Sequence, residues 1–167
     1  MRGCRRVSEG LSPGPGRPGP ATALGEPGYG SLVRVSAKVD YALRAMLELA
    51  AEGGLVKGEQ LATAQAIPQK FLEAILVDLR HAELVASRRG VDGGYSLAKP
   101  ASEISVADVI RAVEGPIATV RGARPDDVVY EGAARALAPV WIELRAAMRD
   151  VLEETTLADL VARSLVD

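Results

Sequence analysis

The hydrophobic pattern changes its period several times along the chain. Apolar residues three or four positions apart predict helices, and capping residues mark the starts of several of them. The predicted helices cover residues 37–51, 59–65, 68–82, 105–113, 139–154 and 157–164. Over 84–88 and 95–98 the period falls to two, which predicts two short strands, and 117–132 is expected to be a loop. The fold class is therefore expected to be mainly α with a small β element.

Two of these helices are separated by a tight joint, Ala66-Ile67, and Pro68 falls in the first turn of the second, where proline is tolerated. Their apolar residues share one interior, formed by Leu61, Ala62, Ile67, Leu72, Ile75, Leu76 and Leu79. This pattern is typical of a helix-turn-helix. The two strands follow, with Asp92-Gly93-Gly94 expected to supply the positive φ of a tight hairpin. A hairpin in this position predicts a wing.

The long C-terminal helix carries a narrow apolar stripe. Its members are spaced 4, 3, 4 and 3 positions apart: Leu137, Trp141, Leu144, Met148 and Val151, called here the C-terminal seam. Such spacing is typical of a coiled coil rather than of a broad globular face, and it needs a partner helix. We expect this stripe to be a dimer interface anchored by Trp141.

Glycine and proline concentrate near the N-terminus, where residues 1–32 hold 8 of the 17 glycines and 5 of the 10 prolines. This arm is expected to be disordered, and its foreign composition suggests that translation starts near Val33. The expected organisation is a disordered arm (1–32), a winged helix-turn-helix DNA-binding domain (33–116), a loop region for an effector (117–138), and the dimerisation and final helices (139–167).

Composition narrows the functional class. The chain has 167 residues, 48% of them hydrophobic and 25% charged, with a net charge of -2, which is typical of a globular protein. No apolar run approaches the roughly 18 to 20 residues of a membrane span, so a cytoplasmic location without membrane contact is expected. One cysteine, Cys4, and one histidine, His81, leave no disulfide, zinc site or catalytic pair. We expect no enzyme.

Four segments carry a resemblance to a known family: residues 35–50 (VSAKVDYALRAMLELA), 67–73 (IPQKFLE), 87–97 (SRRGVDGGYSL) and 156–160 (TLADL). They resemble the Rrf2 family of bacterial transcription regulators, over roughly residues 33–163. The resemblance implies a homodimer whose long C-terminal helices cross between protomers. It also implies that two winged helix-turn-helix units place their recognition helices in successive major grooves of a palindromic operator.

The resemblance also raises the question of an iron–sulfur cluster, because sensing members of the family carry three cysteines ahead of the long helix. Residues 117–138 contain none, and Asp126, Asp127 and Glu131 would be poor substitutes for three thiolates. Asp40 lies where some members supply a fourth ligand, and we expect a structural role for it instead. The chain is thus expected to belong to a cysteine-free branch with no cluster, no metal and no other cofactor.

Base-reading candidates lie at the start of the recognition helix, where side chains reach base edges. Helical spacing puts Gln69, Lys70 and Glu73 outside the apolar stripe. The resemblance implies that Lys70, Phe71 and Glu73 face the major groove of the DNA. Lys70 can donate to guanine or phosphate, and Glu73 can accept from cytosine. The alternative for the three polar residues is that they form an ordinary solvent-exposed helix face. The alternative for Phe71 is packing in the core.

Other DNA-binding candidates lie outside the start of that helix. Arg88 and Arg89 are adjacent on the wing, so alternation sends one of them to each face unless the hairpin turns there, and we expect one to reach DNA. The resemblance places an arginine at Arg89 in the minor groove. Arg80 and Ser36 are candidate phosphate contacts, with surface decoration as the alternative.

The predicted function is a homodimeric, sequence-specific transcriptional regulator, most simply a repressor, that binds double-stranded DNA. The alternative is a protein-interaction module that docks a metabolic enzyme or another regulator and has weak or lost DNA binding. A third hypothesis adds a small-molecule or protein effector at loop 117–132, through Arg121, Arg124 and Tyr130.

Overall fold

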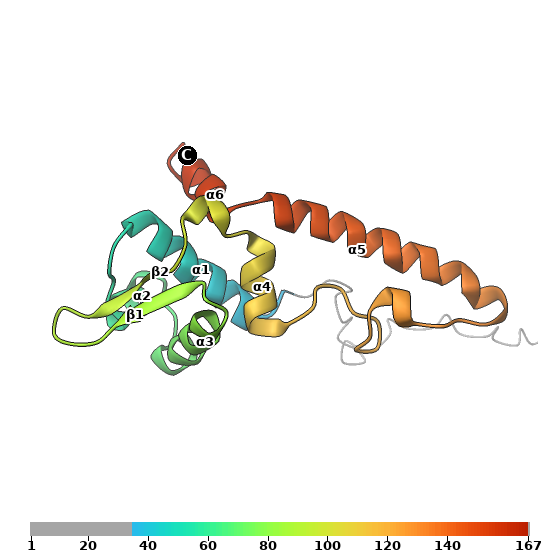
Figure 1. Cartoon of the computed structure of the whole chain (residues 1–167), viewed down its shortest axis with the longest axis horizontal. Coiled ribbons are helices and arrows are strands. Elements are labelled where there is room, and N and C mark those ends of the chain that lie inside the picture. Colours follow the sequence, from blue (N-terminus) through green and yellow to red (C-terminus); the bar gives the residue numbers. More distant parts are fainter. Residues whose placement is uncertain (1–34, 167) are drawn as a thin grey trace, which may run out of the picture. The chain divides into compact units, whose positions relative to one another are not determined.

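The computed structural model describes residues 35–166 (Figure 1). The predicted arm 1–32, with Cys4, lies outside the described residues. The helices are α1 (Ala37–Glu52), α2 (Gly58–Ala64), α3 (Gln69–His81), α4 (Val106–Glu114), α5 (Leu137–Glu154) and α6 (Leu157–Ser164). The strands are β1 (Val85–Arg88) and β2 (Gly94–Leu97), and short 3₁₀ turns are η1 (Ala101–Glu103), η2 (Pro125–Asp127) and η3 (Gly132–Ala136). The fold class is mainly α with a small β wing, as predicted.

Helix α1 is the centre of the core and packs against α2, α3, α4, α6 and β2. Its apolar residues recur every three or four positions, so that Ala42, Met46 and Leu49 are almost fully buried. Burying one large side chain of this kind stabilises a fold by roughly 1.5–3 kcal/mol. The predicted interior of the helix-turn-helix joins the same core, and of its seven members only Ala62 keeps partial exposure.

The turn between α2 and α3 is as short as predicted. Ala66 adopts a positive φ of 50°, and the backbone N–H of buried Ile67 donates to the Ala62 carbonyl at 2.9 Å. Helix α3 begins at Gln69, one residue after Pro68, whose carbonyl accepts from the backbone N–H of Leu72. This turn holds α3 against the core along one side and leaves its other side exposed.

Strands β1 and β2 form the predicted antiparallel hairpin, with Arg88 paired to Gly94. The expected source of positive φ was wrong: Gly90 has it, at 113°, whereas Gly93 and Gly94 do not. Those two glycines are needed for space, because a Cβ on Gly94 would lie 2.7 Å from the Val56 carbonyl oxygen. Val56 bridges to Tyr95 through two 2.8 Å hydrogen bonds, which ties the wing to the segment before α2.

The predicted capping boxes fix the starts of α4 and α6. Ser105 and Asp108 cap α4 reciprocally, and Thr156 and Asp159 do the same for α6. Backbone hydrogen bonds between these two caps, including Leu157 N–H to the Ile104 carbonyl at 2.9 Å, hold α6 against the body. Helix α6 therefore returns to the core and does not extend α5.

The segment between α4 and α5 is more ordered than the predicted loop. Arg121 and Gly122, both with positive φ, form a tight turn closed by two hydrogen bonds between Val120 and Ala123. Turn η2 then packs on α5, and its Pro125 is buried. Helix α5 begins at Leu137, two residues before the predicted start at Pro139, because proline is accepted in a first turn. Within residues 35–166, no helix is both long enough and apolar enough to span a membrane.

Candidate nucleic-acid interface

Helix α3 leaves its outward side uncovered. Lys70 and Glu73 are exposed there, and Phe71 and Val77 are 62% and 41% exposed. The core alternative for Phe71 is therefore wrong: helical spacing places it at the flank of the buried stripe, one turn before Ile75, but its side chain projects into solvent. A projecting helix with exposed side chains of mixed chemistry has the shape that a major groove accepts.

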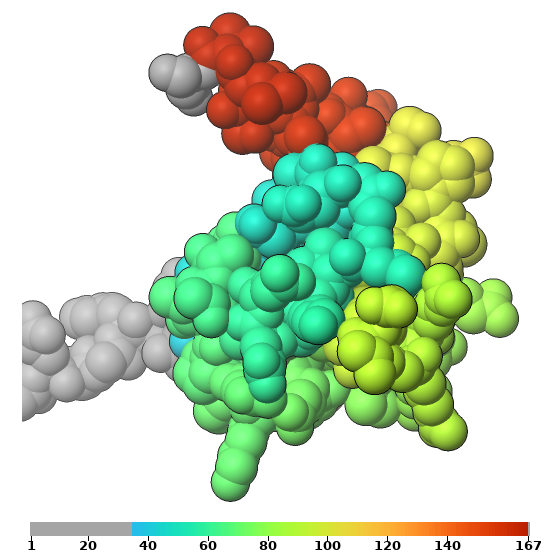
Figure 2. Space-filling view, turned by 90° about the vertical axis from the view of Figure 1, so that its left-hand side faces the viewer, coloured from blue at the N-terminus to red at the C-terminus, as the bar shows by residue number. Residues whose placement is uncertain are grey.

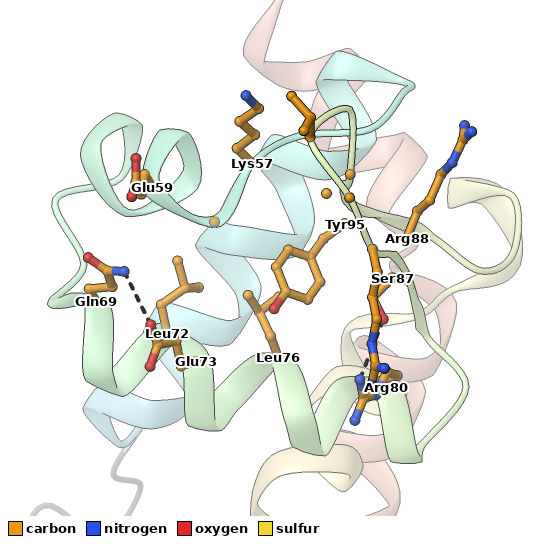
Figure 3. Close-up of a pocket in the computed structure, with 16 residues that line it drawn as sticks. Lys57, Glu59, Gln69, Leu72, Glu73, Leu76, Arg80, Ser87, Arg88 and Tyr95 are labelled. Carbon is orange, nitrogen blue, oxygen red and sulfur yellow. Dashed lines mark hydrogen bonds between the residues drawn. The ribbon is translucent and has the colours of Figure 1, made fainter.

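A groove of about 560 Å³ separates α3 from the wing (Figure 3). We call it the α3–wing groove. Its charged lining residues are four cations and two carboxylates: Lys57, Arg80, Arg88, Arg89, Glu59 and Glu73. In Figure 2 the green of α2–α3 and the yellow-green of the hairpin project on either side of a recess at the lower edge. Arg88 enters this lining, but its side chain extends away from α3 (Figure 3), which leaves three cations against two carboxylates, an excess that suits a phosphate backbone.

The polar side chains at this groove are held only lightly. Gln69 Nε2 donates to Glu73 Oε1 at 3.2 Å, one turn along α3. Arg80 Nη1 donates to Ser87 Oγ at 3.4 Å, which links the end of α3 to β1. Both contacts are exposed and the second is long, so these groups can exchange their partners for DNA at little cost.

The predicted DNA-binding residues fall into three places. Five line or flank the groove: Gln69, Glu73, Arg80, Arg88 and Arg89. Lys70 and Phe71 lie on the outward side of α3, beside the groove rather than in its lining. Ser36 is the N-cap of α1, and its Oγ accepts from the Val39 N–H at 3.1 Å. Its hydroxyl hydrogen is the one group left to donate to a phosphate.

Several groove residues were missed from the sequence, among them Lys57 and Tyr95. Lys57 precedes α2, and Tyr95 of β2 lies in the middle of the groove wall (Figure 3). The first helix of a helix-turn-helix commonly crosses the DNA backbone, so a lysine at its start was a usable signal. Tyr95 offered no such signal in the sequence, because only the pairing of Val56 with β2 brings it to the groove.

The C-terminal seam lies on α5 with no buried member. Leu137, Leu144 and Val151 are 42%, 37% and 66% exposed, whereas Trp141 and Met148 are half-buried against the same chain. An uncovered apolar stripe along about four turns of helix is costly in water and favours association.

Comparison with known proteins identifies the family. The model of the Rrf2 family, described as iron-dependent transcriptional regulators, matches residues 35–163. The chain belongs to the Rrf2 family. A Mycobacterium tuberculosis protein named as an HTH-type transcriptional regulator, Rv1287, is 53% identical over 135 residues, covering 80% of this chain and 84% of that protein. CymR of Bacillus subtilis, also named an HTH-type transcriptional regulator, is 36% identical over 132 residues, 78% of this chain and 91% of CymR.

Solved structures of Rrf2 proteins share the fold. The structure of B. subtilis CymR, titled the global cysteine regulator, superposes with a TM-score of 0.69 at 34% identity, covering 79% of this chain and 98% of CymR. IscR of T. potens gives 0.65 at 31% identity, over 80% of this chain and 89% of IscR. The chain is thus a winged-helix, DNA-binding transcriptional regulator, and its family is one of regulators rather than enzymes. These relatives favour DNA binding over the protein-docking alternative.

The iron dependence in the family description is not matched by donors here. An iron–sulfur cluster is held mainly by thiolates, and within residues 35–166 no three Cys, His, Asp or Glu side chains gather at metal-binding distance. Asp40 is instead paired with Arg44 at 3.4 Å, the structural role that we expected. The chain is not strictly cysteine-free, since it contains Cys4, but 117–138 lacks the triad. The described residues do not fit a cluster.

Proposed function

We propose that this Rrf2 protein is a homodimeric repressor that binds a palindromic operator without an iron–sulfur cluster. One observation carries the proposal: each protomer presents one α3–wing groove, and the uncovered seam on α5 supplies a means of pairing two such grooves. A closed dimer has twofold symmetry, so its preferred site is an inverted repeat. A regulator of this kind acts where the chromosome lies, which supports a cytoplasmic location.

Base reading is assigned to the first turns of α3. Lys70 donates to guanine O6 and N7 or to a phosphate, and Glu73 accepts from cytosine N4 while its charge repels acceptor-rich base edges. Gln69, now bonded to Glu73, is free to turn toward adenine once Glu73 engages a base. Exposed Phe71 contacts a thymine methyl.

Phosphate and minor-groove contacts are assigned to the rim of the α3–wing groove. Arg89 enters the minor groove beside the half-site, where a narrow groove concentrates negative potential. Arg80 and Lys57 lie on the two walls of the groove and contact the backbone on either side of α3. Ser36 is assigned a weaker phosphate contact at the N-terminus of α1.

Dimerisation is assigned to the C-terminal seam, anchored by Trp141. Trp141→Ala is expected to weaken the dimer and, because bivalency is lost, to weaken operator binding far more than binding of one half-site. Light scattering at low protein concentration measures the first effect, and duplexes with one or two half-sites measure the second. A variant that keeps the dimer mass would contradict the assignment.

Contact with the DNA backbone is tested by salt dependence, which reports the sequence-independent part of binding. Affinity for the operator should fall steeply as salt rises, because each phosphate contact releases a counterion. A flat salt response would argue against the proposed interface. A matched duplex with one half-site inverted separates loss of palindrome recognition from loss of general DNA affinity.

A further inference from the structure

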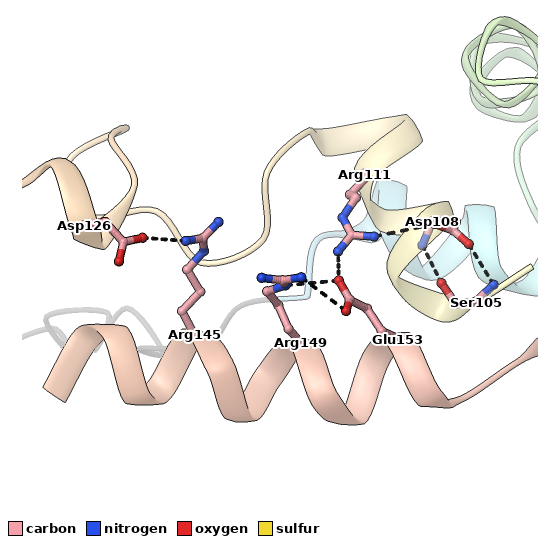
Figure 4. Close-up of polar contacts among 7 residues, drawn as sticks. All are labelled: Ser105, Asp108, Arg111, Asp126, Arg145, Arg149 and Glu153. Carbon is pink, nitrogen blue, oxygen red and sulfur yellow. Dashed lines mark hydrogen bonds and ion pairs between the residues drawn. The ribbon is translucent and has the colours of Figure 1, made fainter. Parts of the chain in front are cut away.

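A second concave site lies between α4, the segment after it, and α5 (Figure 4). It is a cavity of about 500 Å³. Four of its seven lining residues are arginines, and the others form a short apolar and backbone wall: Arg111, Arg124, Arg145, Arg149, Gly115, Pro116 and Ile117. We call it the arginine cavity. Arg145 and Arg149 lie one turn apart on α5, where two like charges repel unless an anion lies between or beside them.

Acidic side chains of the same chain offset only part of this charge. Arg145 Nη1 lies 2.7 Å from Asp126 Oδ2. Glu153 is shared between Arg149, whose Nε lies at 3.0 Å, and Arg111. Hydrogen bonds from these two arginines hold the pKa of Glu153 below its ordinary value. Arg111 also pairs with Asp108 at 3.5 Å, so three carboxylates face four guanidinium groups.

Two arginines retain donors without acceptors. Arg145 Nε is buried and has no hydrogen-bond partner, although its side chain as a whole is 20% exposed. Arg124 is exposed, and its side chain makes neither a hydrogen bond nor an ion pair to any of residues 35–166, so its donors are open to a ligand. A buried N–H without an acceptor is unfavourable, and in native proteins it commonly marks a place for a water, an ion or a ligand.

We propose that the arginine cavity binds a small organic anion through its carboxylate or phosphate oxygens. Arg145 Nε and the guanidinium of Arg124 donate to these oxygens, because planar guanidinium groups match both anions in geometry. Pro116 and Ile117 contact the carbon part of the ligand. The four arginines, together with the orphaned Nε, select an anion over a neutral or cationic molecule.

This site differs from the effector hypothesis drawn from the sequence. Of the three residues named there, only Arg124 lines the cavity. Arg121 stacks on Tyr130, with its Cζ 5.8 Å from the ring centroid, and so serves the fold of the segment. The other arginines that line the cavity are Arg111, Arg145 and Arg149, and they come from the helices before and after the predicted loop.

The position of the cavity connects it to the proposed function. Helix α4 packs on α1 and on the recognition helix α3, whereas α5 carries the C-terminal seam about a third of a turn away from Arg145, Arg149 and Glu153. An anion held by both α4-side and α5 residues therefore sets the angle between the DNA-binding unit and the dimer helix. Since this consequence rests on the proposed function, we expect the anion to change operator affinity.

The binding test uses the full chain without DNA. Thermal melts and calorimetry are run with succinate in one arm and inorganic phosphate in the other, at constant ionic strength maintained with chloride. At least one arm should give a saturable rise in melting temperature. Arg124→Gln should weaken binding at least tenfold, and the exposed Arg163→Gln on α6 is the matched control that should retain it.

A second variant keeps the fold intact. Arg145→Lys retains a cation for Asp126 but removes the Nε donor, so it should lose at least fivefold in anion affinity with little change in the ligand-free melt. No saturable response in either arm, or an equal response in Arg124→Gln and Arg163→Gln, would overturn the site.

The regulatory consequence is measured separately, by operator affinity with and without the saturating anion. A shift of at least threefold, absent in Arg124→Gln, is expected. If the anion binds but operator affinity is unchanged, the proposed coupling between the cavity and DNA binding is wrong, although the anion site itself is supported. If the protein bound no DNA while the anion still bound, the proposed function would fail and the site would stand.

Discussion

Arg89 offers the sharpest test of the wing, because its neighbour Arg88 is a built-in control. Ser87 faces α3, where it accepts the hydrogen bond from Arg80. Alternation turns Arg88 to the opposite face of β1, and Figure 3 shows its side chain extending away from α3. Arg89 follows the end of β1 and lines the α3–wing groove. Arg89→Gln should therefore weaken operator binding, whereas Arg88→Gln should have a small effect.

The expected change in salt dependence for Arg89→Gln follows from the loss of one cationic contact in each protomer of the proposed dimer. Each contact contributes about 0.9 to the slope of log affinity against log salt, so the slope should become shallower by about 1.8. Over a fourfold rise in salt, from about 50 to 200 mM, the affinity advantage of the wild type should then shrink by about 12-fold.

The assay is fluorescence anisotropy with a labelled operator duplex, recorded at four or more salt concentrations for the wild type and both variants. Thermal melts of the three proteins should coincide, since both arginines are exposed at the wing. Equal losses in the two variants would refute the assignment of faces, and a wild-type slope in Arg89→Gln would refute the contact itself.

Three further predictions test other parts of the molecule. Leu144→Asp on the C-terminal seam should give monomers in light scattering at micromolar concentration; an unchanged dimer mass would place the interface elsewhere. Gly94→Ala should cost about 1–3 kcal/mol of stability in a thermal melt, because its Cβ would press on the Val56 carbonyl. Hydrogen bonds from the side chain and backbone of Thr156 lower the pKa of Asp159, so its stabilising contribution is present above the ordinary carboxyl pKa and is lost as pH falls through the lower folded value. The stability difference between wild type and Asp159→Asn should accordingly narrow on acidification, and a pH-independent difference would contradict the capping box.

Features with local causes could be predicted from the sequence. The capping boxes at Ser105 and Thr156 satisfy helix N–H groups with neighbours three residues away, so their geometry depends on little else. The hairpin was predictable for the same reason. The glycine with the positive φ was not predictable. Gly93 and Gly94 are required because the backbones of Arg88 and Val56 approach them closely, and not because the turn needs a positive φ there.

Features that depend on distant pairings could not be predicted. Arg111 meets Glu153 across 42 positions, and no spacing rule connects them. The same holds for the arginine cavity, whose residues are unremarkable surface cations until α4 and α5 are placed together. At the α3–wing groove, helical spacing identified Gln69 and Glu73. The position of Lys57 at the start of the first helix was a signal left unused, and only Tyr95 required the folded chain.

Selection of genomic fragments on the purified protein tests whether it recognises an inverted repeat without an iron–sulfur cluster. The protein is purified without oxygen, an absorption spectrum is taken, and bound fragments are sequenced. We expect an inverted repeat with half-sites about one helical turn apart and a protein without visible absorption. Fragments with no common motif, together with capture of a stoichiometric protein partner, would contradict the DNA-binding account, and a brown protein would contradict the absence of a cluster.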